Sequence, residues 1–367
     1  MKGPRYTPLV ASLPSTVPFV GPETQERQRG VPFAARIGAN ESVFGPSPAS
    51  VAAMAEAAKT VWRYGDPENH DLKADLAAQL DVAPANIVVG EGIDGLLGYL
   101  VRLLVREGTP VVTSLGAYPT FNYHVAGFGG RLVTVPYRDD AEDPDALLEA
   151  AAREDAALIY FANPDNPMGS WHSAATVERM IASLPEGAVL CLDEAYLEFA
   201  PEGTAPPIDF AHPRVIRFRT FSKAYGMAGA RVGYGIAEAG FARAFDKVRN
   251  HFGVNAIAQA GARAALADAG HLAEVRRRVE ASRERIAEIA RANGLSPLPS
   301  ATNFVTIDCG RDADYAKAVL EGLIARDIFV RMPFVAPQNR CIRISAGTEE
   351  DLDLLAKALP DVLKELG

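Results

Sequence analysis

The sequence predicts an α/β protein in which a large domain, built on a mainly parallel sheet covered by helices, is followed by a smaller α+β domain. Between about residues 71 and 248, short apolar segments alternate with helical segments. Strands too apolar to face water on either side are typical of a parallel sheet buried between helices. After His251 the pattern changes to long helices rich in Arg and Glu, and then to a mixture of strands and helices. This change predicts the second, smaller domain.

The first 36 residues contain six prolines and little hydrophobic periodicity, so we expect an extended arm or a short helix there. An alanine-rich helix is expected over residues 50–58, and the turn-forming residues 63–67 should follow it. The predicted domain limits are residues 1–36 for the arm and 46–250 for the large domain, with 37–45 and 251–367 forming the small domain.

The expected elements of the large domain follow the alternation in order. Helices are predicted over residues 71–80, 92–106, 145–153 and 174–183. Strands are predicted over residues 86–90, 111–114, 131–135, 157–161, 188–193 and 215–220.

The C-terminal part should contain two long helices, three strands and a closing helix. The long helices are expected over residues 256–268 and 272–293, and the strands over residues 303–308, 328–331 and 341–345. The closing helix should begin at a capping box, Thr348 to Asp351, and run to Leu366.

The composition narrows the class of protein. The 367 residues carry 46 acidic and 37 basic side chains, a formal charge of −9, without a long basic tract, which argues against nucleic acid and anionic membranes as partners. We find neither an apolar run near the roughly 20 residues of a membrane span nor a signal-peptide pattern. The three cysteines and six histidines lack metal-ligand spacing, so we expect no metal site. A cytoplasmic protein is the resulting prediction.

One segment, residues 219–234, carries a candidate covalent site. Lys223 follows an apolar strand and could form an imine with an aldehyde. Thr220, Ser222 and Arg231 lie close to it in the sequence and could hold a phosphate. Taken alone, the segment is also consistent with an ordinary surface turn.

Three further motifs fall at the predicted ends of strands, where sites of parallel sheets gather. Asp193 ends an apolar strand, where a carboxylate is unfavourable unless it meets a cation such as a protonated pyridine. Asn166 lies in a turn-rich segment and could donate to a phenolate-like oxygen, and the glycine-rich helix start at residues 92–95 could bind a phosphate. Each motif alone has a structural explanation as a cap, turn or packing device. Their combination points to pyridoxal phosphate.

These motifs resemble those of the fold-type I, class I/II aminotransferases, and most closely those of the histidinol-phosphate aminotransferases. The resemblance runs from about Gly38 to the C-terminus and preserves the order of the motifs. The matching segments are residues 40–48, 64–67, 163–169, 193–199, 222–223, 231, 254–255 and 343–348.

The resemblance implies a pyridoxal 5'-phosphate cofactor and a role for each matching residue. Lys223 would bond covalently to the cofactor, Asp193 would pair with its pyridine nitrogen, and Asn166 and Tyr196 would hold its 3′ oxygen; Lys223, Asp193 and Tyr196 are the implied catalytic residues. The implied phosphate ligands are the amides of Ile93 and Asp94, the side chains of Thr220, Ser222 and Arg231, and Tyr64 from a neighbouring subunit. The last contact implies a homodimer with a shared active site.

Substrate contacts are implied in the same way. Arg343 would bind the α-carboxylate, Arg331 matches a position that contacts a substrate phosphate, and Asn40 matches a substrate-binding position. Phe121 stands where the family usually stacks a tyrosine on the cofactor. Ile93 and Met168 also depart from the usual residues, which leaves the substrate open.

The implied activity is a ping-pong transamination between an amino donor such as L-histidinol phosphate and 2-oxoglutarate, as in histidine biosynthesis. Amino acids and 2-oxo acids are then the small-molecule partners. Two alternatives stay open: an aromatic or general amino-acid aminotransferase, and a decarboxylase of a phosphorylated amino acid. A transcription regulator with the same fold is disfavoured, because the arm is too short for a DNA-binding domain and the chain is acidic.

Overall fold

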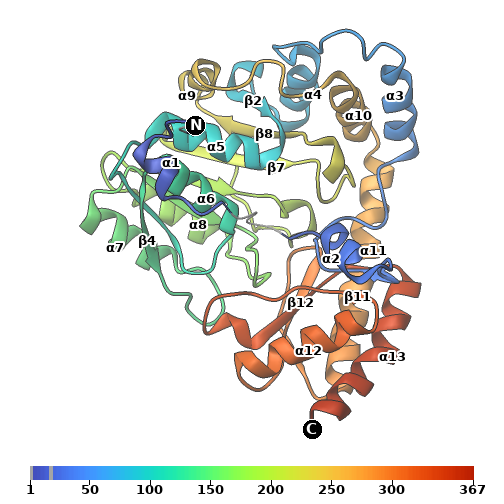
Figure 1. Ribbon diagram of the computed structural model, residues 1–367. Coiled ribbons are helices and arrows are strands. Elements are labelled where there is room, and N and C mark those ends of the chain that lie inside the picture. The colour runs from blue at the N-terminus through green and yellow to red at the C-terminus, as the bar shows by residue number, and fades with distance from the viewer. Residues whose placement is uncertain (1–2, 16–19) are drawn as a thin grey trace.

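The computed structural model describes residues 3–15 and 20–367, and a seven-stranded sheet forms its centre (Figure 1). The strand order is β2-β8-β7-β6-β5-β3-β4. The strands are β2 (Ile87–Gly90), β3 (Pro110–Ser114), β4 (Arg131–Val135), β5 (Leu158–Ala162), β6 (Val189–Asp193), β7 (Val215–Thr220) and β8 (Gly233–Ala237). Strands β3 to β7 pair in parallel, whereas β8 is antiparallel to both of its neighbours. The predicted mainly parallel sheet is confirmed.

Helices cover both faces of this sheet and bury it. Strands β5 and β6 are buried along their whole length, as their unbroken apolar runs predicted. One core cluster joins the sheet to α5 (Gly92–Leu104), α6 (Pro119–Gly127) and α9 (Ala239–Ala244). Two other clusters join it to α7 (Pro144–Glu154) with α8 (Ala174–Ala182), and to α4 (His70–Leu80) with α10 (Ala256–Ala267). Helix α3 (Pro48–Ala58) packs on α10.

A second, smaller group of elements lies below the large sheet in Figure 1. Its antiparallel sheet has the order β12-β10-β9, with β9 (Ser296–Pro297), β10 (Phe304–Asp308) and β12 (Cys341–Ser345). Three helices pack on it: α11 (Ala269–Ala292), α12 (Ala313–Ala325) and α13 (Glu349–Leu366). The capping box of α13 is present, since Thr348 and Asp351 bond each other's backbone amides.

The N-terminal strand β1 (Ala35–Arg36) belongs to this smaller group. It pairs in parallel with β11 (Ile328–Phe329), and the following residue, Ile37, is buried in the same core cluster. The predicted division at residue 250 stays a prediction. The packing of α10 against the large sheet shows that the core around that sheet extends past residue 250.

The N-terminal arm contains two short helices, α1 (Pro8–Ser12) and α2 (Pro22–Arg29). An ion pair between Arg29 and Asp327 joins α2 to the smaller group, and Leu9 of α1 lies close to Gly129, just after α6. The remaining short 3-10 turns are η1 (Pro84–Asn86), η2 (Leu197–Phe199), η3 (Ala228–Ala230), η4 (Phe245–Lys247) and η5 (Gln338–Arg340).

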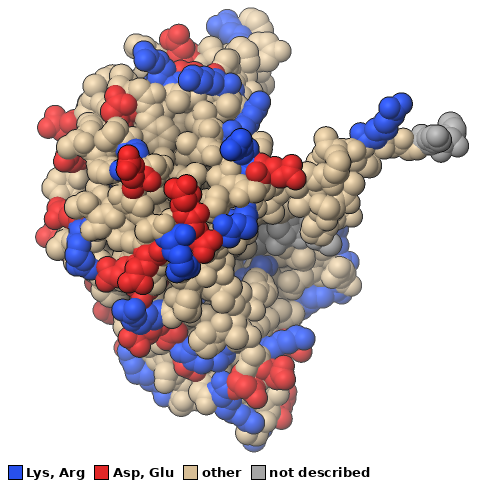
Figure 2. Space-filling view, turned by 90° about the vertical axis from the view of Figure 1, so that its left-hand side faces the viewer, with Lys and Arg blue, Asp and Glu red and all other residues tan. Residues whose placement is uncertain are grey.

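The surface shows mixed charge on the face drawn in Figure 2, where basic and acidic side chains are interspersed. Among the described residues, no helix is both long and apolar enough to cross a bilayer. Within the same residues we also find no group of three or more His, Cys, Asp or Glu side chains arranged to hold a metal ion.

Candidate active site

The carboxyl ends of β5, β6 and β7 bring the predicted residues to one edge of the large sheet. Asp193 is the last residue of β6, while Asn166 and Lys223 lie in the segments that follow β5 and β7. The three strands are adjacent and parallel, so their ends coincide. The smaller group of elements adds Arg331 and Arg343 from the other side.

Lys223 is half-buried and faces the connection that precedes α3. Its Nζ donates a hydrogen bond to the backbone oxygen of Asn40 at 3.0 Å and lies 5.5 Å from the centre of the Tyr196 ring. It forms no ion pair within the described part of the chain. Burial, helped by the positive charge of Arg343, lowers the pKa of Lys223 to about 8. Its amine is therefore a stronger nucleophile near neutral pH than an exposed lysine.

Asp193 is a buried carboxylate without a cationic partner at ion-pair distance in residues 3–15 and 20–367. It accepts hydrogen bonds from the Tyr160 hydroxyl at 2.7 Å and from the Ala195 amide at 3.0 Å. Burial raises the pKa of Asp193 to about 6, although both hydrogen bonds act in the opposite direction. A cation placed beside this carboxylate would relieve its desolvation.

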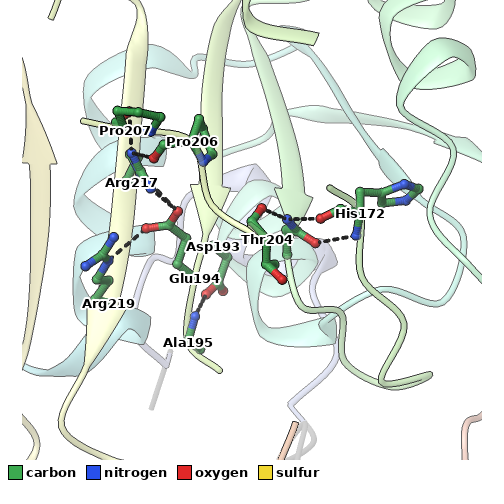
Figure 3. Close-up of polar contacts among 10 residues, drawn as sticks. His172, Asp193, Glu194, Ala195, Thr204, Pro206, Pro207, Arg217 and Arg219 are labelled. Atoms are coloured by element: carbon green, nitrogen blue, oxygen red, sulfur yellow. Dashed lines mark hydrogen bonds and ion pairs between the residues drawn. The ribbon is translucent and has the colours of Figure 1, made fainter. Parts of the chain in front are cut away.

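The neighbouring Glu194 shows the contrasting arrangement (Figure 3). Arg217 donates to its Oε1 from Nε at 3.0 Å and from Nη2 at 2.6 Å, and Arg219 donates to its Oε2 at 2.8 Å. Burial alone would raise the pKa of Glu194, but the charges of the two arginines lower it. Glu194 is thus neutralised within the fold, whereas Asp193 is left for an external cation.

The N-terminus of α5 lies against the guanidinium of Arg231, an arrangement that could bind an anion. Gly92 has a φ of +75°, and a Cβ atom on it would lie 2.6 Å from Nη2 of Arg231, so a glycine is needed for this close approach. The N-cap residue Glu91 makes no side-chain capping bond. The first amides of α5, including those of Ile93 and Asp94, are therefore available to an anion beside a guanidinium.

Thr220 and Ser222 are linked to each other at the end of β7. The Thr220 hydroxyl donates to Ser222 Oγ at 3.0 Å and accepts from the Ser222 amide at the same distance. The segment that places both hydroxyls also carries Lys223, so the candidate covalent residue and two hydroxyl groups lie in one turn.

Arg331 and Arg343 lie directly opposite each other on neighbouring extended segments. Each donates its backbone amide to the other's carbonyl, at 3.2 and 2.6 Å, in an isolated antiparallel bridge. Residues paired in this way point their side chains to the same face, and like charges there are destabilising. Burial lowers the pKa of Arg343 to about 10, and the charge of Arg331 acts in the same direction. An anion between the two arginines would offset this repulsion.

The side-chain contacts of the arginines differ. Arg343 donates to Asn166 Oδ1 and, at 3.3 Å, to the Gly38 carbonyl, and its buried Nε has no hydrogen-bond partner. Arg331 donates to the Val20 carbonyl at 2.8 Å and lies 5.5 Å from the Phe334 ring centre.

Asn40 connects several site residues instead of facing an open space. It has a φ of 55° and is 2% exposed. Its Nδ2 donates to the Tyr196 hydroxyl at 3.2 Å, and its Oδ1 accepts from Ser345 Oγ at 2.9 Å. Both ends of the Asn40 side chain are thus engaged within the protein, and its predicted contact with substrate stays a prediction.

The predicted stacking role of Phe121 stays a prediction, and the Phe121 ring packs in the core. Its side chain is fully buried and stacks on Tyr160, with ring centres 4.5 Å apart and an interplanar angle of 19°. Tyr118, which sequence reasoning passed over, is half-buried, and Asp94, Tyr196 and Asp193 all influence its pKa. Burial raises that pKa to about 12. The available signal was Pro119, because a proline at the first helical position leaves the preceding residue outside α6, as its N-cap.

The comparison with known families identifies the class of protein. Residues 35–359 match the family described as Aminotransferase class I and II. The chain therefore belongs to this family, and its reaction class is the transfer of an amino group.

The individual relatives with high similarity are histidinol-phosphate aminotransferases, a narrower group. The histidinol-phosphate aminotransferase of Anaeromyxobacter sp. (strain Fw109-5) is 38% identical over 334 residues, which cover 89% of this chain and 91% of that protein. That of Moorella thermoacetica is 30% identical over 364 residues, covering 98% of this chain and 93% of the relative. The crystal structure of histidinol-phosphate aminotransferase from Sinorhizobium meliloti in complex with pyridoxal-5'-phosphate is 59% identical, with a TM-score of 0.97, and covers 100% of this chain and 99% of that one.

Proposed function

We propose that the protein is a pyridoxal-phosphate-dependent aminotransferase that moves the amino group of L-histidinol phosphate to 2-oxoglutarate. The observation that carries this proposal is the pair of opposed arginines, Arg331 and Arg343, at the edge where Lys223 lies. Two guanidinium groups on one face suit substrates with two anionic groups or a phosphate dianion. The names of the relatives favour the same donor.

The residues of the site fit pyridoxal phosphate chemically. Lys223 would hold the aldehyde carbon, Asp193 the pyridine nitrogen, and Asn166 with Tyr196 the ring oxygen. The phosphate would bind the amides of Ile93 and Asp94 and the side chains of Thr220, Ser222 and Arg231. When bound, the cofactor supplies an electron sink for the pair of electrons released at the substrate Cα.

The protein's own residues would then control the substrate and the proton. Arg343, or Arg331 for a phosphate group, would hold the anionic end of the donor and fix the direction of its Cα–H bond. Lys223 would take up the Cα proton, because its lowered pKa gives a substantial fraction of free amine near neutral pH.

We further propose two revised roles. Tyr118, in place of Phe121, would cover one face of the cofactor ring, since it is half-buried and within reach of the charges of Asp94 and Asp193. Asn40 would orient Tyr196 and Lys223 through its hydrogen bonds to both.

A homodimer is part of the proposal. Trp62 and Tyr64 are 75% and 83% exposed, and the Tyr64 ring lies 4.8 Å from that of the half-exposed Phe252. Large aromatic side chains exposed together are typical of protein interfaces. Tyr64 would reach the phosphate of the partner subunit's cofactor.

The test is the absorbance of the purified holoenzyme while L-histidinol phosphate, L-phenylalanine, L-glutamate and L-threonine phosphate are added in turn. We expect L-histidinol phosphate to convert the cofactor band to that of the amine form at the lowest concentration. Preferential conversion by L-phenylalanine would keep the aminotransferase and favour the aromatic or general amino-acid alternative. Release of carbon dioxide from L-threonine phosphate would instead support the decarboxylase.

A further inference from the structure

Two buried carboxyl groups, Glu142 and Asp165, lie behind the proposed active site and have no role in the reaction described above. They are 2% and 1% exposed. Glu142 lies between β4 and α7, and Asp165 lies between β5 and α8, one residue before Asn166. In the described residues, neither forms an ion pair with a lysine or arginine. Buried carboxylates without a cation are strongly disfavoured.

Hydrogen bonds connect the two carboxyl groups to residues at or just after the ends of β3, β4 and β5. Glu142 accepts from Ser114 Oγ at 2.6 Å and from the Ala162 amide at 2.9 Å. Asp165 accepts from the Tyr137 hydroxyl at 2.9 Å and from the Met168 amide at 3.0 Å. The hydrogen bonds of Asp165 hold the segment that carries Asn166, because Asp165 and Met168 lie on either side of Asn166 in the chain. The Asn166 side chain in turn accepts a hydrogen bond from Arg343.

The charges around the pair decide its protonation. Tyr137 and His172 approach it from loops, Asp193 from β6 and Arg343 from β12. Burial, reinforced by the negative charge of Asp165, raises the pKa of Glu142 well above its usual value. Burial raises the pKa of Asp165 to about 6, although a side-chain hydrogen bond between Asp165 and Glu142 acts in the opposite direction. Burial also lowers the pKa of His172, so that ring does not supply a counter-charge near neutral pH. Two interacting acids of this kind lose their protons in separate steps.

We propose that Glu142 and Asp165 share one proton, carried by Glu142, and act together as a positioning pair for Asn166 and Arg343. With one proton the pair holds a single negative charge. A second charge would attract the Arg343 guanidinium and repel the anionic group of the substrate. The shared proton therefore keeps Arg343 available. The functional part of this inference rests on the role proposed for Arg343.

The proton can be tested directly by infrared spectroscopy of the holoenzyme near neutral pH. We expect a carbonyl band of a protonated carboxyl group in the wild type that is lost in Glu142→Gln. Glu149→Gln, the same change at an exposed position on α7, is the matched control and should keep the band. Absence of a difference between the wild type and Glu142→Gln would overturn the proposal.

Steady-state kinetics test the positioning role. Asp165→Asn cannot accept both hydrogen bonds of Asp165, so the KM of the amino donor should rise about tenfold, with a smaller change in kcat. Glu142→Gln keeps an amide of the same shape in place of the protonated carboxyl and should change KM much less. Equal effects, or a larger effect of Glu142→Gln, would contradict the assignment of the proton. If Arg343→Lys leaves KM unchanged, the proposed substrate contact fails, while the infrared result still decides the proton.

Stability against pH gives a readout independent of activity. The folded protein keeps a proton that an unfolded glutamate releases above its ordinary pKa of 4.5, so rising pH must destabilise the wild type relative to Glu142→Gln. Well above pH 6, where Asp165 is ionised in both states, the unfolding equilibrium constant of the wild type should rise by about tenfold per pH unit relative to the variant. Urea unfolding at fixed protein and cofactor concentrations measures this ratio. Parallel pH curves would refute the shared proton.

Discussion

Lys223 is set apart from the other lysines by its surroundings. We predict that the apoprotein takes up pyridoxal phosphate faster as pH rises through about 8, the pKa that burial and Arg343 give this amine. The reason is that the neutral amine attacks the aldehyde, and an ordinary lysine would become neutral near 10.5. Stopped-flow absorbance at a series of pH values measures the rate. Lys223→Ala is the control and should show no covalent absorbance; a half-point near 10.5 would contradict the prediction.

Tyr118 and Phe121 should respond differently to the same substitution. Tyr118→Leu removes the proposed stacking ring, so the Kd of pyridoxal phosphate should rise by about tenfold, while the unfolding free energy changes little. Phe121→Leu should lower the unfolding free energy by about 1–2 kcal/mol, because it leaves a cavity beside Tyr160, and should change Kd less. Fluorescence titration and urea unfolding measure the two quantities. The reverse assignment would follow if Phe121→Leu weakened cofactor binding more.

At this scale the sequence indicates candidate residues more readily than their packing. Lys223, Asp193 and Arg231 could be singled out because reactive or charged side chains follow apolar strands or turns in a recognisable order, and their roles stay predictions. The choice between Tyr118 and Phe121 depends on how the chain is oriented at the start of α6, and the two residues are only three positions apart. Glu142 and Asp165 are far apart in the chain, so nothing in the sequence indicated that they meet.

At the scale of a single element, the contribution of the capping box of the closing helix α13 can be tested by mutation. Thr348 Oγ1 accepts from the Asp351 amide at 3.2 Å, and Asp351 Oδ2 accepts from the Thr348 amide at 2.8 Å. Thr348→Ala removes the first of these bonds and should lower the unfolding free energy by about 1 kcal/mol. Urea unfolding measures the change, and Thr348→Ser, which keeps the hydroxyl, should stay near the wild type. Equal losses in both variants would show that the threonine methyl, not the cap, stabilises the helix.

The limits of helices and strands were predicted accurately where the apolar pattern of the sequence matches the buried positions of the element. Strands β6 and β7 and helix α13 have strong apolar patterns, and their observed limits differ from the predicted ones by one residue or less. Strand β8 was missed because its glycines, Gly233 and Gly235, leave room for Ile93 and Phe218 instead of contributing apolar side chains. Strand β11 is two residues shorter than predicted, because after Phe329 the backbone leaves β1, and Arg331 pairs with Arg343 instead.

The whole molecule should be active as a dimer with shared sites. We predict that mixing two weakly active variants, Tyr64→Ala and Lys223→Ala, restores activity after subunits exchange. One site of the mixed dimer would then receive an intact Lys223 from one chain and an intact Tyr64 from the other. The activity of the mixture, followed over time after brief dissociation in mild denaturant, measures the exchange. Each variant treated alone is the control, and a mixture no more active than its components would show that Tyr64 serves its own subunit.

The pairing of β1 with β11 has a consequence for how the protein is made. Ile37 donates its amide to Phe329 and accepts a hydrogen bond from Ser345, so the beginning of the chain is held by segments synthesised near its end. On the ribosome, the large sheet can form while residues 35–37 still lack their partners. Asn40 and Lys223 therefore reach their final arrangement late, after the last strand has emerged. A truncated chain would consequently have a folded core before it had a working site.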